Sequence, residues 1–315
     1  MKRKWLFFLL KFVFGFGLLF YLVFFSAKPR EIIVVFSHAF WPMALLAFSL
    51  HSLGLYFSAK RWKLILDEKG GGFSFWQLIQ SLLVGTFFNH FLPTRFGGDV
   101  VRIRDTRHIE QGLTASLAVV VYERMSGIVA LLLMAMFSSF LKIGFIKELP
   151  LLYVSLLVSM AGIAVLWLAW KILPRGFLAG IGCRRPWLQN VLLKLDMFHG
   201  IILDFLQHKR LSQKVFGWAF ILQLNVVVHY FFIGQALKMT RIPFLDYFFS
   251  IPILLFILSF PVSINGIGVR DFFLIKLFVY YGYPASYAIA FSMLDVAFNL
   301  LLGIVGGLIY IFRKK

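Results

Sequence analysis

Charge, and acidic charge above all, is scarce in this sequence of 315 residues. Only 14% of the residues are charged, and 13 aspartates and glutamates face 32 lysines and arginines. Cys183 is the single cysteine, which excludes an intramolecular disulfide and a thiolate metal cluster. The seven histidines have no metal-ligand spacing, and His51 and His90 have no acid close by in sequence, so neither a metal site nor another cofactor is predicted. No Gly-Lys-Ser/Thr phosphate loop occurs, so we do not expect ATP hydrolysis.

Apolar residues dominate the remaining composition. The sequence is 61% hydrophobic and 18% aromatic, and several windows reach the length of about 20 apolar residues that a bilayer crossing requires. The run after the basic residues 2–4 lacks a small-x-small cleavage site, so we predict an uncleaved first helix. We therefore predict an integral membrane protein. Its predicted spanning helices cover residues 5–25, 38–59, 114–141, 151–172, 215–237 and 285–312.

The formal net charge of +19 comes from basic residues in short segments beside the apolar runs. Lysine and arginine in such places fix membrane topology, so we do not predict a nucleic-acid partner. Two further apolar stretches, residues 73–92 and 243–260, end in motifs rich in proline, glycine and charge. If each stretch dips in and returns to the same side, residues 60–113, residues 171–214 and both termini are cytoplasmic, as the positive-inside rule favours.

The predicted fold is an all-α polytopic membrane protein with about six spanning helices and two re-entrant helical hairpins. Its two halves, residues 1–145 and 146–315, form an inverted repeat in this topology. Each half also carries two acids that are 24 positions apart, Asp99 and Glu123 in the first and Asp271 and Asp295 in the second.

Local patterns predict how several helices begin and pack. Between residues 186 and 208, apolar residues keep a helical period beside charged ones. This pattern predicts an amphipathic helix on the cytoplasmic face, for which a connecting role is favoured over a regulatory one. Ser74 and Gln77 have the spacing of a capping box for the helix that follows. In the last helix, the predicted close-packing residues are Gly303, Gly306 and Gly307.

The two interrupted motifs are built from the same kinds of residue. The first contains Asn89, Pro93, Arg95, Gly97, Gly98, Asp99 and Arg102, and the second contains Pro261, Asn265, Gly266, Gly268, Arg270 and Asp271. In each, proline ends one limb, glycine permits the turn, and the acid can cap the returning helix. A helix N-terminus at membrane depth, with arginine donors beside it, favours a phosphate group.

The alternative role for these arginines is to pair with Asp99 and Asp271 and so lock the turns. For Arg102 and Asp271 both roles stay open. For Arg95 and Arg270 contact with the ligand is favoured.

Ionisable residues inside the predicted spanning helices are functional candidates, because a charge there is costly unless it is paired or hydrated. Glu123 and Arg124 are adjacent, so their side chains point about 100° apart and are predicted to reach separate partners in the re-entrant motif. Asp295 and Asn299 are the counterparts in the last helix. For the two acids, a static hydrogen-bonding role is favoured over carrying a proton.

These residues are similar to those of the lysylphosphatidylglycerol synthase transmembrane region family, also called the flippase-like membrane domain. The similarity covers nearly the full length and lies in Asn89 with Leu92-Pro-x-Arg95-x-Gly-Gly-Asp99 and Arg102, in Glu123-Arg124, and in Pro261 with Asn265-Gly-Ile-Gly-Val-Arg270. The resemblance implies a domain like the one that moves aminoacylated phosphatidylglycerol to the outer leaflet in the multiple peptide resistance factors. Their fused soluble synthase domain is not part of these residues, and Asp271 stands where many relatives have glutamate.

The leading prediction is a lipid translocator of the cytoplasmic membrane without catalytic residues. The predicted partner is a lipid with an anionic headgroup: an anionic or aminoacylated phospholipid, or a polyprenyl-phosphate-linked lipid, that binds between the motifs. One alternative is an intramembrane lipid-phosphate enzyme, in which Ser263 and Thr94 are available nucleophiles, although no clustered glutamates or His–acid pair accompany them. The other alternative is a non-catalytic scaffold for a separate lipid-modifying enzyme.

Overall fold

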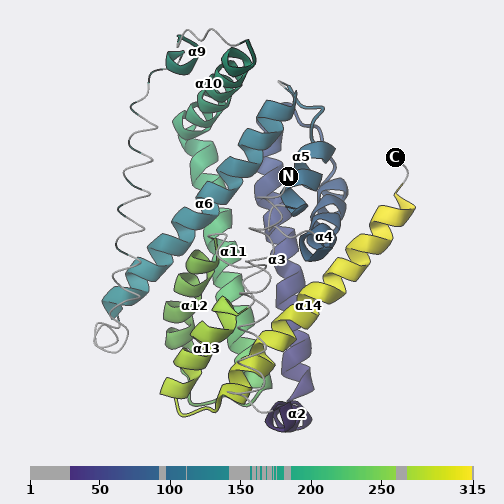
Figure 1. The fold of residues 1–315 in the computed structure, drawn as a ribbon, viewed down its shortest axis with the longest axis vertical. Helices are drawn as coiled ribbons and strands as arrows, with labels where there is room; N and C mark the ends of the chain where they lie inside the picture. The colour runs from purple at the N-terminus through teal and green to yellow at the C-terminus, as the bar shows by residue number, and fades with distance from the viewer. Residues whose placement is uncertain are drawn as a thin grey trace.

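The computed structural model describes residues 29–91, 97–110, 112–141, 186–259 and 268–313, together with residues 157, 161, 164, 168, 172, 174 and 176–180. Every secondary-structure element in these residues is a helix (Figure 1). The helices are α2 (Pro29–Ser37), α3 (Trp41–Asp67), α4 (Phe75–Phe91), α5 (Gly97–Asp105), α6 (Gly112–Leu141), α9 (Phe177–Gly180), α10 (Pro186–Gln207), α11 (Lys209–Ala236), α12 (Phe244–Ser259), α13 (Val269–Tyr280) and α14 (Ala285–Phe312).

Four of the described helices, α3, α6, α11 and α14, are long and apolar enough to cross a membrane. They coincide with the predicted spans at 38–59, 114–141, 215–237 and 285–312, which confirms an integral membrane protein of helical class. The predicted helix at 5–25 and most of the one at 151–172 lie outside the described residues. Large apolar side chains on the outer face of α14, such as Ile304, Leu308 and Ile311, are exposed, as a lipid-facing surface requires.

The helices pack in pairs around two apolar cores. α3 lies along α11, and α14 lies along α4. One core gathers around Tyr247, Phe278 and Phe291, and the other around Trp62 and Phe205, all of them fully buried. The first core is built mainly from α11, α12, α13 and α14, and the second joins α3, α4 and α6 to α10, so the polar residues described below are held by closely packed apolar surroundings.

The predicted close packing is confirmed at Gly306 and Gly307, and the predicted capping box is confirmed as well. A Cβ built on Gly306 would overlap the backbone carbonyl of Leu83, and one on Gly307 would lie 2.8 Å from the Phe87 ring, so the backbones of α14 and α4 touch only because these positions are glycine. At the start of α4, the Ser74 amide donates to Gln77 Oε1 at 3.0 Å, and the Gln77 amide donates to Ser74 Oγ at 3.2 Å.

Polar contacts tie the connecting segments together at the two ends of the molecule. At one end, Arg313 after α14 pairs with Asp105 at 2.6 Å, and Lys69 after α3 pairs with Asp204 of α10 at 3.8 Å. At the other end, the Arg241 amide donates at 3.0 Å to the hydroxyl of Tyr283, between α13 and α14. The segments predicted to share the cytoplasmic side therefore meet at one end, the end that carries α10 and the C-terminus in Figure 1.

The two helix pairs that are predicted to form hairpins lie toward opposite ends of this arrangement. α4 and α5 lie toward the end that carries α10, whereas α12 and α13 lie toward the end that carries α2 (Figure 1). With 17 and 16 residues, α4 and α12 are about 25 Å long, which is shorter than the roughly 30 Å hydrocarbon core of a bilayer. The re-entrant hairpins stay a prediction that these lengths favour, because residues 92–96 and 260–267 lie outside the described residues.

Candidate functional site

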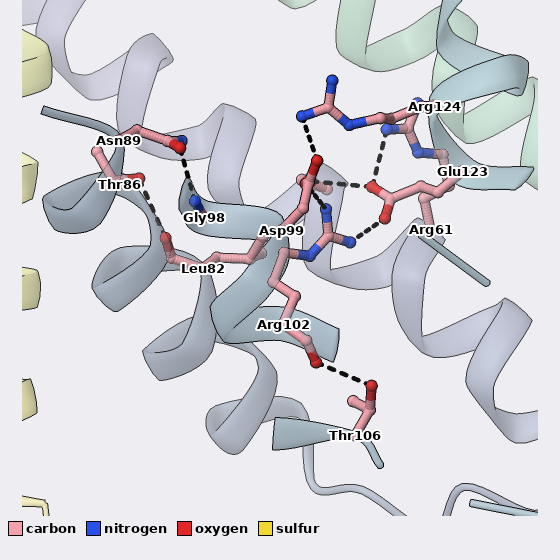
Figure 2. A network of polar contacts seen from close by, with 11 residues as sticks. Arg61, Leu82, Thr86, Asn89, Gly98, Asp99, Arg102, Thr106, Glu123 and Arg124 are labelled. Atoms are coloured by element: carbon pink, nitrogen blue, oxygen red, sulfur yellow. Dashed lines mark hydrogen bonds and ion pairs between the residues drawn. The ribbon is translucent and has the colours of Figure 1, made fainter. Parts of the chain in front are cut away.

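A buried carboxylate at the middle of α6 collects donors from two other helices. Glu123 accepts a hydrogen bond from Arg61 Nη2 of α3 at 2.8 Å and another from Arg102 Nη2 of α5, and Ser58 Oγ of α3 donates to it at 3.3 Å (Figure 2). Glu123, Arg61 and Arg102 are all buried. Two guanidinium groups on one carboxylate form a strong, geometrically fixed pair of charge-assisted contacts.

The neighbouring residue on α6 reaches a different acid, as the sequence predicts. Arg124 Nη2 lies 2.5 Å from Asp99 Oδ2, while Asp99 Oδ1 lies 3.8 Å from Arg102 Nη1. The Arg102 guanidinium also stacks 4.2 Å above the ring of Trp62, a cation–π contact. Asp99 lies inside the first turn of α5, and its carboxylate engages arginines instead of the backbone amides that a capping residue would meet. Arg102 therefore makes the pair with Asp99 that a locking role requires, and contact with a ligand stays open.

This first cluster carries an unbalanced positive charge. Three arginines, Arg61, Arg102 and Arg124, face two carboxylates, Asp99 and Glu123. Among the described residues no hydrogen-bond partner reaches Arg61 Nε, Arg61 Nη1 or Arg102 Nε, although all three atoms are buried. Buried donors of this kind are costly unless an acceptor meets them, so the cluster is suited to hold an anion.

Close backbone contact between α4 and α5 fixes the position of α5, which carries Asp99 and Arg102 of the cluster. The Gly98 amide donates to Asn89 Oδ1 at 2.6 Å, and a Cβ on Gly98 would lie 2.9 Å from the Gly85 carbonyl oxygen. Gly98 thus serves close packing of the hairpin, and Gly97 beside it is the first residue of α5. Pro93, Arg95 and Thr94 lie outside the described residues.

A second buried carboxylate, Asp295, occupies the middle of α14. Its Oδ2 accepts from Arg270 Nη1 of α13 at 2.8 Å and from the Tyr230 hydroxyl of α11 at 3.3 Å. Its Oδ1 lies 3.4 Å from Nε2 of His229, also on α11. Arg270, which was predicted to contact a ligand, is therefore held by an acid of this chain, and the Asn299 side chain donates at 3.0 Å to the Asp295 backbone carbonyl.

Asp271 anchors the start of α13. Asp271 Oδ2 accepts the Gly268 amide at 2.8 Å, its Oδ1 accepts the Ser292 hydroxyl of α14, and the same Oδ1 lies 3.9 Å from Arg270 Nε. Gly268 has a φ of +81°, which favours glycine at this turn. Pro261, Asn265, Gly266 and Ser263 lie outside the described residues.

The two clusters are built alike. In each, an arginine on a short helix, α5 or α13, pairs with an acid in the middle of the long helix that follows, α6 or α14. Sequence reasoning missed Arg61, His229 and Tyr230, which complete the two clusters from α3 and α11. Arg61 follows the predicted end of its span at residue 59, but α3 continues to Asp67 and carries Arg61 onto Glu123.

Comparison with known proteins gives one match. The family model described as Lysylphosphatidylglycerol synthase TM region matches residues 8–307, a range that includes both clusters. No curated protein and no solved structure matches the chain.

Proposed function

The chain belongs to the lysylphosphatidylglycerol synthase TM region family, and from that premise we propose that it moves a lipid with an anionic headgroup across the cytoplasmic membrane. Membership itself supports a membrane-lipid role. One observation carries the finer proposal: the buried positive excess around Glu123, with guanidinium nitrogens of Arg61 and Arg102 that no acceptor in the described residues reaches. A phosphate or phosphodiester oxygen would satisfy these donors, and the guanidinium fork matches phosphate geometry.

The depth of the two acids supports binding near the bilayer midplane. Glu123 lies 11 residues after the start of α6 and Asp295 lies 10 after the start of α14, which puts each about 15 Å from a helix end. This is half of the roughly 30 Å hydrocarbon core. Midplane sites between repeats are the common arrangement in secondary transporters.

The opposite placement of the hairpins supports alternating access. We propose that residues 1–145 and 146–315 are inverted repeats and that the basic end with α10 and the C-terminus faces the cytoplasm. Rocking of the α4–α5 hairpin against the α12–α13 hairpin would then open the first cluster to one leaflet or the other. Neither catalysis nor a partner enzyme is needed for this function.

The test is a leaflet-exposure assay in proteoliposomes with fluorescent phosphatidylglycerol and phosphatidylcholine and a membrane-impermeant quencher. Wild type is expected to move phosphatidylglycerol, but not phosphatidylcholine, to the leaflet that the quencher reaches. Arg61→Gln is expected to reduce the rate of phosphatidylglycerol movement at least tenfold. Arg61→Gln suits the test because Arg102 still pairs with Glu123. Arg313→Gln, which removes an ion pair at the molecular end, is the matched control and is expected to behave as wild type.

The outcomes separate the three functions. Equal rates in wild type and Arg61→Gln, with monodisperse protein, would overturn the proposal for the site. Absence of lipid movement with release of inorganic phosphate from a lipid phosphate would favour the enzyme, and absence of both signals would favour the scaffold.

A further inference from the structure

The second cluster has the opposite charge balance from the first. Arg270 faces two carboxylates, Asp271 and Asp295, so with neutral imidazoles the cluster carries an unbalanced negative charge. His51 of α3 and His229 of α11 lie beside Asp295 of α14, and one ligand atom from each of these three lies within 4.8 Å of the others. We propose that His51, His229 and Asp295 form a binding site for a divalent transition metal of the zinc class. The inference is independent of lipid movement.

The orientation of His229 makes a cation necessary between it and the acid. His229 Nδ1 lies 2.8 Å from the Ala47 carbonyl oxygen, and because a carbonyl only accepts, Nδ1 carries the hydrogen. A neutral ring therefore points the lone pair of Nε2 at Asp295 Oδ1, 3.4 Å away. Two acceptors face each other at this distance, which is favourable only if a cation lies between them.

The distance itself suits a metal ion better than a proton. A charge-assisted N–H···O bond is about 2.7–2.9 Å long, which is shorter than the 3.4 Å found here. Ligands that are about 2.0–2.1 Å from a tetrahedral zinc ion are separated by about 3.3–3.4 Å. The carboxylate and the imidazole are therefore spaced as two ligands of one metal.

The second imidazole also has a polar contact with a neighbouring side chain. His51 is half-buried, its ring centroid lies 4.9 Å from that of His229 at an angle of 45°, and its ring hydrogen-bonds the Asn299 side chain. His229 is thus engaged through Nδ1 by an oxygen outside the site, and the His51 ring offers a ligand atom within 4.8 Å of those of His229 and Asp295. Metal-binding histidines are typically oriented by such outer acceptors.

The third ligand is also supported from outside. Asp295 Oδ2 is held by Arg270 and Tyr230, which leaves Oδ1 for the metal. Two imidazoles and a carboxylate are a donor set that zinc prefers, and three protein ligands leave a fourth position for water or an anionic oxygen. A divalent ion reverses the negative excess of this cluster to a positive one.

The experiment measures metal bound to the full-length protein in detergent, purified through a tag that contains no histidine. After incubation with Zn²⁺ and gel filtration, wild type is expected to retain about one zinc per chain by mass spectrometry. Cobalt loading is expected to give the visible absorption of a four-coordinate Co²⁺ centre. Both signals should fall at least tenfold in His229→Gln and in His51→Ala. The control is His208→Ala, an exposed histidine between α10 and α11.

Retention of zinc by both site variants at the wild-type level would overturn the assignment of these residues. A wild type that retains no more zinc than His229→Gln would overturn the metal site altogether and leave a proton as the cation between His229 and Asp295. A monodisperse gel-filtration profile for every variant excludes misfolding as the cause of a loss. Because no lipid is transported in this measurement, its failure is distinct from failure of the proposed function.

Discussion

Replacement of Glu123 by glutamine tests whether the first cluster is held by its central acid. Glu123→Gln keeps the size of the side chain but removes the charge that Arg61 and Arg102 share. The cluster then holds three arginines and a single carboxylate, Asp99. Removal of one partner from a buried ion pair costs about 3–5 kcal/mol, a large part of the roughly 5–15 kcal/mol that stabilises a typical protein. At about 2 °C per kcal/mol, the unfolding midpoint should fall by about 6–10 °C.

A second substitution separates charge balance from packing. Glu123→Gln/Arg61→Gln restores the wild-type excess of one positive charge, so it should recover at least 0.5 kcal/mol, about the smallest coupling expected of residues in contact. The assay is thermal unfolding in detergent followed by the fluorescence of the eight tryptophans. Glu110→Gln, an exposed acid, is the control and should stay within about 0.5 kcal/mol of wild type. A single variant as stable as this control, or a double variant no better than the single, would refute the reasoning.

Three further predictions test other parts of the structure. Ser74→Ala removes an oxygen of the confirmed capping box and should lower the free energy of unfolding by about 1 kcal/mol; an unchanged urea midpoint in detergent would contradict it. Gly306→Val drives a side chain into the backbone of α4, whereas Gly217→Val adds one in open space. Measured by urea unfolding in the same way, Gly306→Val should lower the free energy of unfolding several times as much as Gly217→Val. Lys209 and Lys238 are exposed at opposite ends of α11, so each can be replaced by cysteine in a Cys183→Ser background. In intact cells an impermeant maleimide should label Lys238→Cys, whereas Lys209→Cys should be labelled only after permeabilisation. Equal labelling of both variants in intact cells would reject the topology.

Local signals predicted the helices better than they predicted the partners of the charged residues. The apolar run at 285–312 defined α14 to the residue, because Pro284 precedes it and the basic residues 313–315 follow it directly. The predicted span at 38–59 ended too early, because the run of charges after it resembled a helix end facing water. In the folded chain α3 continues to Asp67, and Arg61 is neutralised by Glu123, which lies 62 positions further along. A short stretch of sequence around Arg61 gives no indication of this pairing.

In the candidate site, too, local sequence predicted some features and missed the partners that lie far away in the chain. The adjacent charges Glu123 and Arg124 could be assigned separate partners from helix geometry alone, and they have them. The partners of Asp295 could not be assigned, because His229 lies 66 positions away on a helix where it has no acidic neighbour in sequence. Arg270 was expected to contact a ligand because arginine beside a glycine turn suits phosphate; the structure adds an ion pair with Asp295 at 2.8 Å, and the ligand contact stays a prediction.

The glycine contact between α14 and α4 also sets an order for biogenesis. α4 belongs to the first half of the chain, but the backbone it touches belongs to the last helix, around Gly306. While the chain is being synthesised, the α4–α5 hairpin therefore waits for more than 200 residues before its packing partner leaves the ribosome. Until then its apolar surface is available to lipid or to the insertion machinery, and the first half cannot reach its final packing by itself. A chain truncated before α14 should consequently be recognised as incomplete by membrane quality control, even though most of its spanning helices are already in place.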